Sequence, residues 1–242
     1  MPNTRTYLHL VLTSDSPHYN EMYKITNEYY KKFDNVTTVY YQFLPDLEDD
    51  YLPDIENNIL YLKGTESHLP GILDKTLKTF FYFKNDIFEN KYDYIVRSNV
   101  STVVNFHLLD NETEKNKIDY GGAPIWSLAG LHPQDGVMKP EYLNISFVQG
   151  NSIILHNDTM KEIINNIGEI DYNVIDDVAL GVFIKFKCPN IVPYYIHSFN
   201  RNCDCNGDYS LLNNAKNYII NNNKNNDRAV DVQQIKYITS LT

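Results

Sequence analysis

The N-terminal part of the chain predicts a strand, a helix and a second strand in direct succession. Residues 7–12 form an apolar run that breaks into four polar residues, as a buried strand does where it enters a loop. Apolar residues then recur at helical spacing through residues 19–33, and residues 36–44 are rich in β-branched and aromatic side chains. Such a unit implies parallel pairing with a right-handed crossover. We therefore expect an α/β fold with a mixed, mostly parallel central sheet flanked by helices.

A second transition from strand to loop is predicted near the middle of the chain. Residues 92–96 are apolar except for Asp93, and they run into a mostly polar group at residues 97–102. The amphipathic residues 69–90 before them are expected to be helical, and the acidic, proline-containing residues 45–58 to be a surface connection. Ligands of doubly wound sheets bind beyond the carboxyl ends of the strands. We therefore expect Thr13, after the first strand, and the polar group to lie at one binding edge.

Composition and charge narrow the class of protein. A chain of 242 residues that is 43% hydrophobic can fill the core of one large domain. Its net charge of -10 disfavours binding to nucleic acid and to anionic membranes. We find no apolar segment long enough to span a bilayer and no signal-type N-terminus, so we expect a soluble, cytoplasmic protein. Its three cysteines indicate neither a disulfide framework nor a zinc site.

Five sequence blocks occur in an order that resembles a known family. They are LDKTLKTFFYF, YDYIVRSNVSTVVNFHLL, DYGGAPIW, FVQGNSIILHNDTMKEI and IDDVALGVFI. Together they resemble the β-1,3-galactosyltransferase and Fringe-type glycosyltransferases, which have the GT-A fold. The resemblance implies one domain, with a nucleotide-sugar-binding half up to about residue 110 and an acceptor-binding half after it. It also implies an enzyme that transfers a hexosyl unit, with inversion, from a nucleotide-diphosphate sugar to a carbohydrate or other hydroxyl acceptor, a UDP-sugar being the expected donor.

The acidic Asp-X-Asp motif of that family is replaced in this chain. The family uses its carboxylates to hold a divalent ion against the diphosphate, whereas Asn99 and Ser101 stand at those positions. Mn²⁺ and Mg²⁺ prefer anionic oxygen ligands, so these two residues alone should bind them poorly. Arg97 and Lys78 are the cations expected to neutralise the diphosphate instead, unless they are solvated surface charges. His197 is a secondary candidate ligand, because GT-A enzymes often recruit a C-terminal histidine; an ordinary histidine at a strand end is the alternative.

An acidic pair opens the helix predicted near residue 176. Asp176 and Asp177 precede apolar residues at helical spacing, where the family places acceptor recognition and the general base. A carboxylate there can take the proton of an acceptor hydroxyl, with Asp177 the first candidate and Asp176 the second. Capping of the helix is the other role open to both. Gly150 and Trp126 are candidates for acceptor binding, whereas a plain turn and core packing are their ordinary roles.

Two other classes of protein stay open. A GT-A-like domain without its acidic pair could be a catalytically inactive module that binds a nucleotide or a carbohydrate, and binding without turnover would identify it. The third class is an unrelated Rossmann-type enzyme such as a methyltransferase, but no G-x-G-x-x-G follows the first strand. The P-loop, G-x-S-x-G and H-E-x-x-H motifs are absent too, so the sequence gives no motif that would indicate a hydrolase or a nucleoside triphosphatase.

Overall fold

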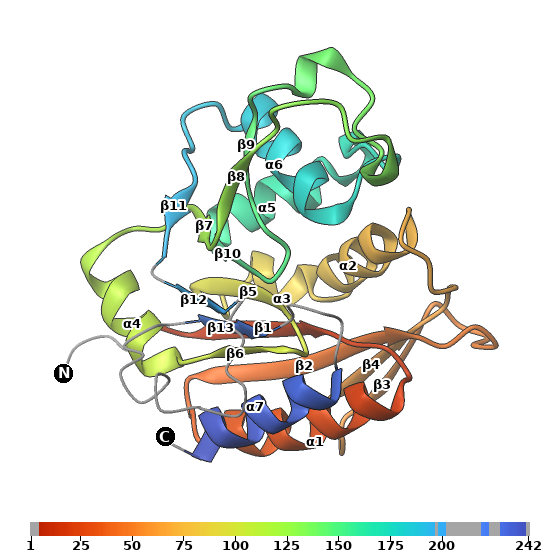
Figure 1. Cartoon of the computed structure of the whole chain (residues 1–242), viewed down its shortest axis with the longest axis vertical. Helices are drawn as coiled ribbons and strands as arrows, with labels where there is room; N and C mark the ends of the chain where they lie inside the picture. Colours follow the sequence, from red (N-terminus) through yellow and green to blue (C-terminus); the bar gives the residue numbers. More distant parts are fainter. Residues whose placement is uncertain (1–4, 197, 202–218, 223–227, 241–242) are drawn as a thin grey trace.

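A central sheet of eight strands organises the fold (Figure 1). The computed structural model describes residues 5–196, 198–201, 219–222 and 228–240. The strands lie in the order β11-β7-β10-β5-β1-β2-β4-β3. Their bounds are β1 Tyr7–Leu12, β2 Val36–Phe43, β3 Tyr51–Asp54, β4 Ile59–Leu62, β5 Tyr94–Asn99, β7 Tyr120–Gly122, β10 Ser152–His156 and β11 Tyr194–Tyr195. Strands β5, β1, β2 and β4 run parallel, while β10 and β3 are antiparallel to their neighbours.

Helices cover both faces of this sheet. Figure 1 shows α1 and α7 below the sheet, and α2, α5 and α6 above it. The helices are α1 Pro17–Tyr30, α2 Gly71–Tyr82, α3 Lys84–Phe88, α4 Phe106–Lys115, α5 Asn157–Asn165, α6 Asp176–Lys187 and α7 Arg228–Ser240, with short 3-10 turns at Pro133–Asp135, Pro140–Tyr142 and Ile167–Glu169. The expected mixed, mostly parallel α/β architecture is confirmed.

Two small sheets complete the strand pairing. One joins β6 (Thr102–Val104) to β13 (Ile219–Asn222), which pairs in turn with β12 (Ser198–Arg201). The other is the antiparallel pair of β8 (Ile125–Ser127) and β9 (Ser146–Val148). None of the described helices is long and apolar enough to cross a membrane. Strands from both sides of residue 110 share the central sheet, and the proposed division into two halves stays a prediction.

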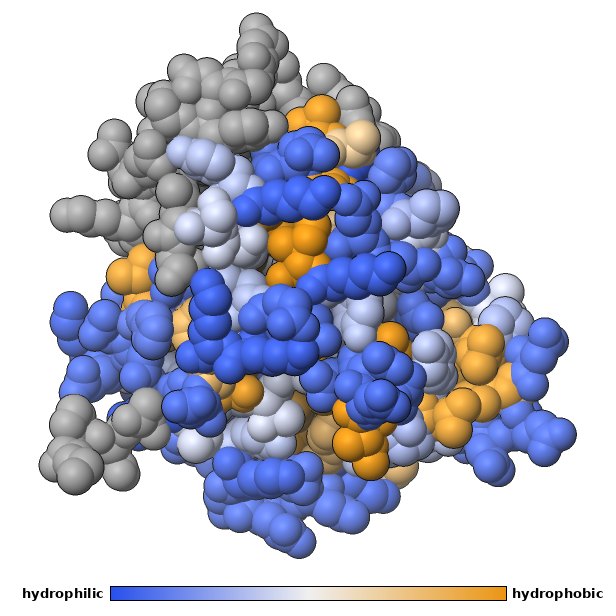
Figure 2. Space-filling view, turned by 90° about the horizontal axis from the view of Figure 1, so that it is seen from below, coloured by the Kyte–Doolittle hydropathy of each residue, from blue (hydrophilic) through white to orange (hydrophobic). Residues whose placement is uncertain are grey.

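The first strand shows why its sequence lacks a polar face. Leu8 and Leu10 belong to the apolar cluster that includes residues of α2, α5 and α6, whereas Tyr7 and Val11 belong to the cluster that includes residues of α1, α4 and α7. A hydrophobic core therefore lies on each face of β1. A strand in this position is apolar along its whole length, whereas alternation with polar residues is typical of a strand that has one face in solvent. Figure 2 shows the outer face that carries α1 and α7, which is mostly hydrophilic with separate apolar spots.

The helix after β1 begins at a cap that the sequence carries. Ser16 accepts a hydrogen bond from the backbone N–H of Tyr19 at 3.3 Å, and Pro17 occupies the first turn, where it needs no donor. The helix thus starts two residues before the periodic stretch and ends at Tyr30, earlier than the expected residue 33. The expected helix over residues 69–90 is divided, because α2 ends at Tyr82 and α3 begins at Lys84.

Two expectations about loops were wrong. The stretch 45–58 contains the edge strand β3, and Pro53 is tolerated there because β3 pairs only with β4 and needs no donor on its outer side. The polar group at 97–102 does not simply follow β5, since β5 extends to Asn99. Polar side chains lie inside this central strand because each finds a partner, such as Ser98, whose Oγ is 2.8 Å from the Nε2 of His9.

Candidate active site

A pocket of about 540 Å³ opens beyond the carboxyl ends of β1 and β5. The chain leaves β1 for β2 on one side and later returns as β5 on the other side, so the pocket lies where the strand order reverses. Such a switch point is where open α/β sheets bind ligands. Five segments contribute walls: residues 12–14, 66–68, 97–101 except Ser98, 149–151 and 175–177. Helix α2 adds two residues, and α1 and α7 add one each.

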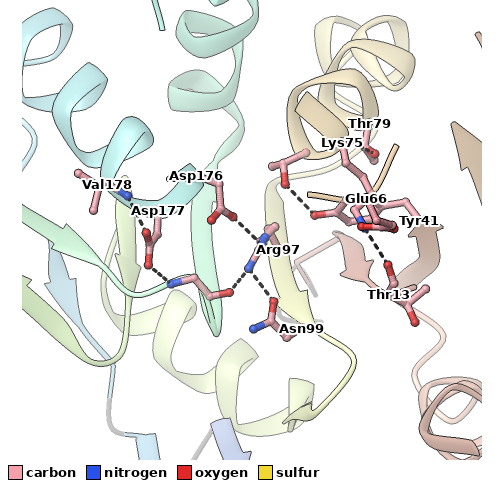
Figure 3. A network of polar contacts seen from close by, with 12 residues as sticks. Thr13, Tyr41, Glu66, Lys75, Thr79, Arg97, Asn99, Asp176, Asp177 and Val178 are labelled. Atoms are coloured by element: carbon pink, nitrogen blue, oxygen red, sulfur yellow. Dashed lines mark hydrogen bonds and ion pairs between the residues drawn. The ribbon is translucent and has the colours of Figure 1, made fainter. Parts of the chain in front are cut away.

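The Arg97 side chain forms the centre of a buried polar network (Figure 3). Its Nη2 donates to Asp176 Oδ2 at 2.6 Å, and its Nη1 donates to Asn99 Oδ1 at 2.9 Å and to the Gly150 carbonyl. Burial is the largest single influence and lowers the pKa of Arg97, but Asp176, Tyr41 and Asp177 together outweigh it, so that the pKa is raised. One guanidinium therefore ties β5 to the β9–β10 turn and to the start of α6.

At Gly150 the main chain comes close to this network. A Cβ at this position would lie 3.2 Å from Arg97 Nη1 and 3.4 Å from Asp177 Oδ2. Its carbonyl accepts from Arg97 while its N–H donates to Asp177 Oδ2 at 2.8 Å. Gly150 thus binds the arginine through its carbonyl and the carboxylate through its N–H.

Asp177 differs from Asp176 in its electrostatic surroundings. The Asp177 carboxylate is half-buried, and it pairs with no cation among the residues that the structure describes. Burial, followed by the charge of Asp176, raises its pKa to about 6, although the N–H groups of Gly150 and Val178 act in the opposite direction. The Val178 N–H donates to Asp177 Oδ1 at 2.8 Å, so helix capping and a high proton affinity coexist at this residue. A carboxylate with this pKa can exchange protons near neutral pH.

The lysine that lines the pocket is Lys75, which sequence reasoning missed. Its Nζ is buried and donates to the Thr13 carbonyl at 2.9 Å and to Glu66 at 2.7 and 2.9 Å (Figure 3). Burial lowers the pKa of Lys75, and the hydrogen bonds to Glu66 offset part of that effect. Lys75 follows Ile72 by one helical turn, and both line the pocket, so the spacing of the apolar stripe was the available signal.

Lys78, chosen from the sequence, lies elsewhere. It pairs with Asp74 at 2.8 Å, donates to the Lys63 carbonyl at 2.9 Å and does not line the pocket. The fold does bring the other candidates of the donor side together, since Thr13, Arg97, Asn99 and Ser101 all line the pocket.

Not all of the residues predicted for acceptor binding and catalysis line the pocket. Gly150, Asp176 and Asp177 line the pocket. Trp126 does not, but it is 54% exposed and its indole N–H donates to the pocket residue Gln149 at 3.4 Å. The secondary metal ligand His197 lies outside the described residues. Arg228 and Tyr19 line the pocket and had not been singled out from the sequence.

The described donor set does not fit a divalent ion. Asn99 Oδ1 already accepts from Arg97, and the Asp176 carboxylate is paired with the same guanidinium. A cation placed between these oxygens would meet the charge of Arg97, which occupies that position. Within the described ranges, no group of three or more His, Cys, Asp or Glu residues is arranged to hold a metal ion.

Comparisons with known proteins give a likeness in structure but not in sequence family. No protein-family model and no curated protein matches the chain. Among solved structures, the chain is similar to a glycosyltransferase involved in the glycosylation of the major capsid of PBCV-1, with 13% sequence identity and a TM-score of 0.47. The match covers 95% of this chain and 99% of that chain. Similarity at this level does not assign an activity to this chain.

Proposed function

We propose that the chain is a glycosyltransferase that moves a hexosyl unit from a nucleotide-diphosphate sugar to a hydroxyl acceptor with inversion. The observation that carries the proposal is Asp177, a half-buried carboxylate with a pKa of about 6 and no paired cation among the described residues, in the wall of the switch-point pocket. The blocks that resemble the β-1,3-galactosyltransferase and Fringe-type enzymes support it, and membership of that family stays a prediction. UDP-sugars are the first donors to test.

The proposed reaction is a single displacement. The acceptor oxygen attacks the anomeric carbon from the side opposite the leaving group, and the bond between that carbon and the diphosphate oxygen breaks. The electron pair leaves with the nucleoside diphosphate, and Asp177 takes the proton of the attacking hydroxyl. Arg97 positions Asp177 indirectly, because Gly150 accepts from Arg97 through its carbonyl and donates to Asp177 through its N–H. Asp176 balances the arginine charge at 2.6 Å.

We further propose that the donor binds without a divalent ion. The guanidinium of Arg97 lies among the oxygens that would otherwise be ligands, so protein cations carry the electrostatic role. Nucleotide release should then be the same in EDTA as in Mn²⁺ or Mg²⁺. A rate that vanishes in EDTA and returns with Mn²⁺ would contradict this, and would direct attention to ligands outside the described residues.

The activity is tested by nucleotide release from a panel of UDP- and GDP-sugars with mono- and disaccharide acceptors. The Asp177→Asn variant should lose at least about 100-fold in transfer rate, because general base catalysis contributes about 10²- to 10⁴-fold. It should still bind the nucleoside diphosphate. Asp158→Asn is the matched control, since Asp158 is an exposed acid of α5 that does not line the pocket.

A binding module is the second candidate, and one observation favours it. Both oxygens of Asp177 already accept backbone N–H groups, one from Val178 in the first turn of α6 and one from Gly150 in the β9–β10 turn, as a purely structural carboxylate would. In that case the wild-type chain would bind a nucleotide or a carbohydrate, and no acceptor in the panel would produce turnover. Equal binding by wild type and Asp177→Asn, with no release of nucleotide by either, would establish the module.

A further inference from the structure

The cations of the pocket differ in how many of their N–H groups are occupied. Lys75, Arg97 and Arg228 line the pocket together with the carboxylates Glu66, Asp176 and Asp177. Lys75 is held by Glu66 and a carbonyl, and both terminal nitrogens of Arg97 donate inside the protein. These two cations balance their own carboxylates, so they add little net charge for an anionic ligand.

Among the described residues, Arg228 forms a hydrogen bond through one of its terminal nitrogens. It begins α7, and its Nη1 donates to Asp231 Oδ2 at 2.9 Å. The centre of its guanidinium lies 5.2 Å from the centroid of the Tyr19 ring, which belongs to α1 and also lines the pocket. The Arg228 side chain is 26% exposed, whereas that of Asp231 is only 4% exposed. The ring and the buried carboxylate therefore fix the guanidinium at the pocket wall.

The remaining donors of Arg228 match one kind of ligand. Its Nε and Nη2 have no hydrogen-bond partner in the part of the chain that the structure describes. A planar guanidinium with two adjacent N–H groups suits the oxygens of a phosphate and can bind them in a bidentate manner. An approaching diphosphate brings at least about two negative charges to a pocket where Asp177 already has no paired cation among the described residues. A cation with open donors is thus what that ligand needs.

We propose that Arg228 binds the diphosphate group of the nucleotide-sugar donor. This proposal rests on the proposed function, because a nucleoside diphosphate is the ligand class in question. Helix α7 lies beside α1 (Figure 1), and the two together carry Arg228 and Tyr19 to the pocket. The donor site then includes a residue from the C-terminal helix, in addition to the segments that follow β1 and β5.

The proposal is tested by titration calorimetry on the full chain with three probes. They are UDP or GDP, the matching nucleoside without phosphates, and inorganic pyrophosphate. Arg228→Gln should weaken binding of the nucleoside diphosphate and of pyrophosphate by at least about tenfold, because a hydrogen bond to a charged group contributes that much. Nucleoside binding should stay unchanged, which also shows that the variant is folded. Arg228→Lys should retain part of the affinity.

Lys236→Ala is the matched control, because Lys236 is a cation of the same helix that pairs with Glu21 and does not line this pocket. It should bind all three probes as the wild type does. If Arg228→Gln binds the diphosphate as tightly as the wild type, the role of Arg228 is overturned and the proposed function stands. If the wild type binds pyrophosphate through Arg228 but no nucleoside diphosphate, the proposed function is overturned and the anion site stands.

Discussion

Arg97 and Asp176 form an ion pair of 2.6 Å between the central strand β5 and the first residue of α6, and both side chains are almost fully buried. Breaking such a pair from one side leaves an unbalanced buried charge, which costs about 3–5 kcal/mol. Asn99 and Gly150 accept from the same guanidinium, so its removal also leaves their oxygens without a donor. This relationship leads to the first prediction.

Arg97→Met should lower the free energy of unfolding by about 3–5 kcal/mol, measured by urea denaturation at pH 7. The double variant Arg97→Met with Asp176→Asn should lose less than the sum of the two single variants, because no charge is left unpaired. Lys236→Met, which breaks an exposed pair with Glu21, should cost less than about 1 kcal/mol. A similar loss in Arg97→Met and Lys236→Met would contradict the buried pair.

The raised pKa of Asp177 predicts the pH dependence of both rate and stability. A general base must be ionised, so the transfer rate should rise with pH through about 6 and then level off. The folded protein holds this proton more tightly than the unfolded chain does. Stability from this group is therefore present below the ordinary pKa near 4 and is lost as the pH rises through about 6.

The stability effect should amount to about 1–3 kcal/mol between pH 4 and pH 7. It is measured as the difference between wild type and Asp177→Asn in urea denaturation at each pH, so that other titrating groups cancel. A difference that is constant across this range would mean that Asp177 has an ordinary pKa. The rate profile would then have no inflection near 6.

Lys75 and Lys78 form a matched pair for testing the pocket, because they lie three residues apart on α2. Lys75→Met should weaken donor binding, because it leaves the Glu66 carboxylate without its cation at the pocket wall. It should also lower the free energy of unfolding by about 1–3 kcal/mol, since it removes the hydrogen bonds of the buried Lys75 Nζ to Thr13 and Glu66. Lys78→Met should change donor binding little, because Lys78 lies outside the pocket wall. Calorimetry and urea denaturation on both variants measure this, and a stronger effect of Lys78 would restore the expectation from the sequence.

Trp126 should act on the acceptor and not on the donor. Its exposed ring lies next to Gln149, so Trp126→Ala should raise the KM for a sugar acceptor by about 3- to 10-fold and leave the affinity for the nucleotide unchanged. Phe186→Ala is the control, since Phe186 is exposed to a similar extent but lies near the end of α6 away from Asp176 and Asp177, with its ring beside Tyr142. A change in nucleotide affinity instead of acceptor KM would place Trp126 on the donor side.

Much of the scaffold could be predicted from local patterns. The apolar run of β1, the spacing in α1 and α6, and the strand β2 are visible in the sequence because burial of an element repeats with its own period. The edge strand β3 was missed because its acidic and proline-rich residues resemble a loop, and only pairing with β4 makes it a strand. The extent of β5 was missed for a related reason. Its buried polar side chains are stabilised by hydrogen bonds to residues that are distant in the sequence.

The sequence by itself determined the α/β class, the order of the main elements and the placement of Thr13, Asn99 and Asp177 near strand and helix ends. Only the tertiary structure decided which charges meet. Asp176 lies 79 residues from Arg97 and Arg228 comes from the last described helix, yet both line one pocket. Periodicity reports which way a side chain points within its own element, whereas an ion pair depends on which loops the sheet brings together at its carboxyl edge. For that reason the place of Arg228 in the pocket became visible only in the folded chain.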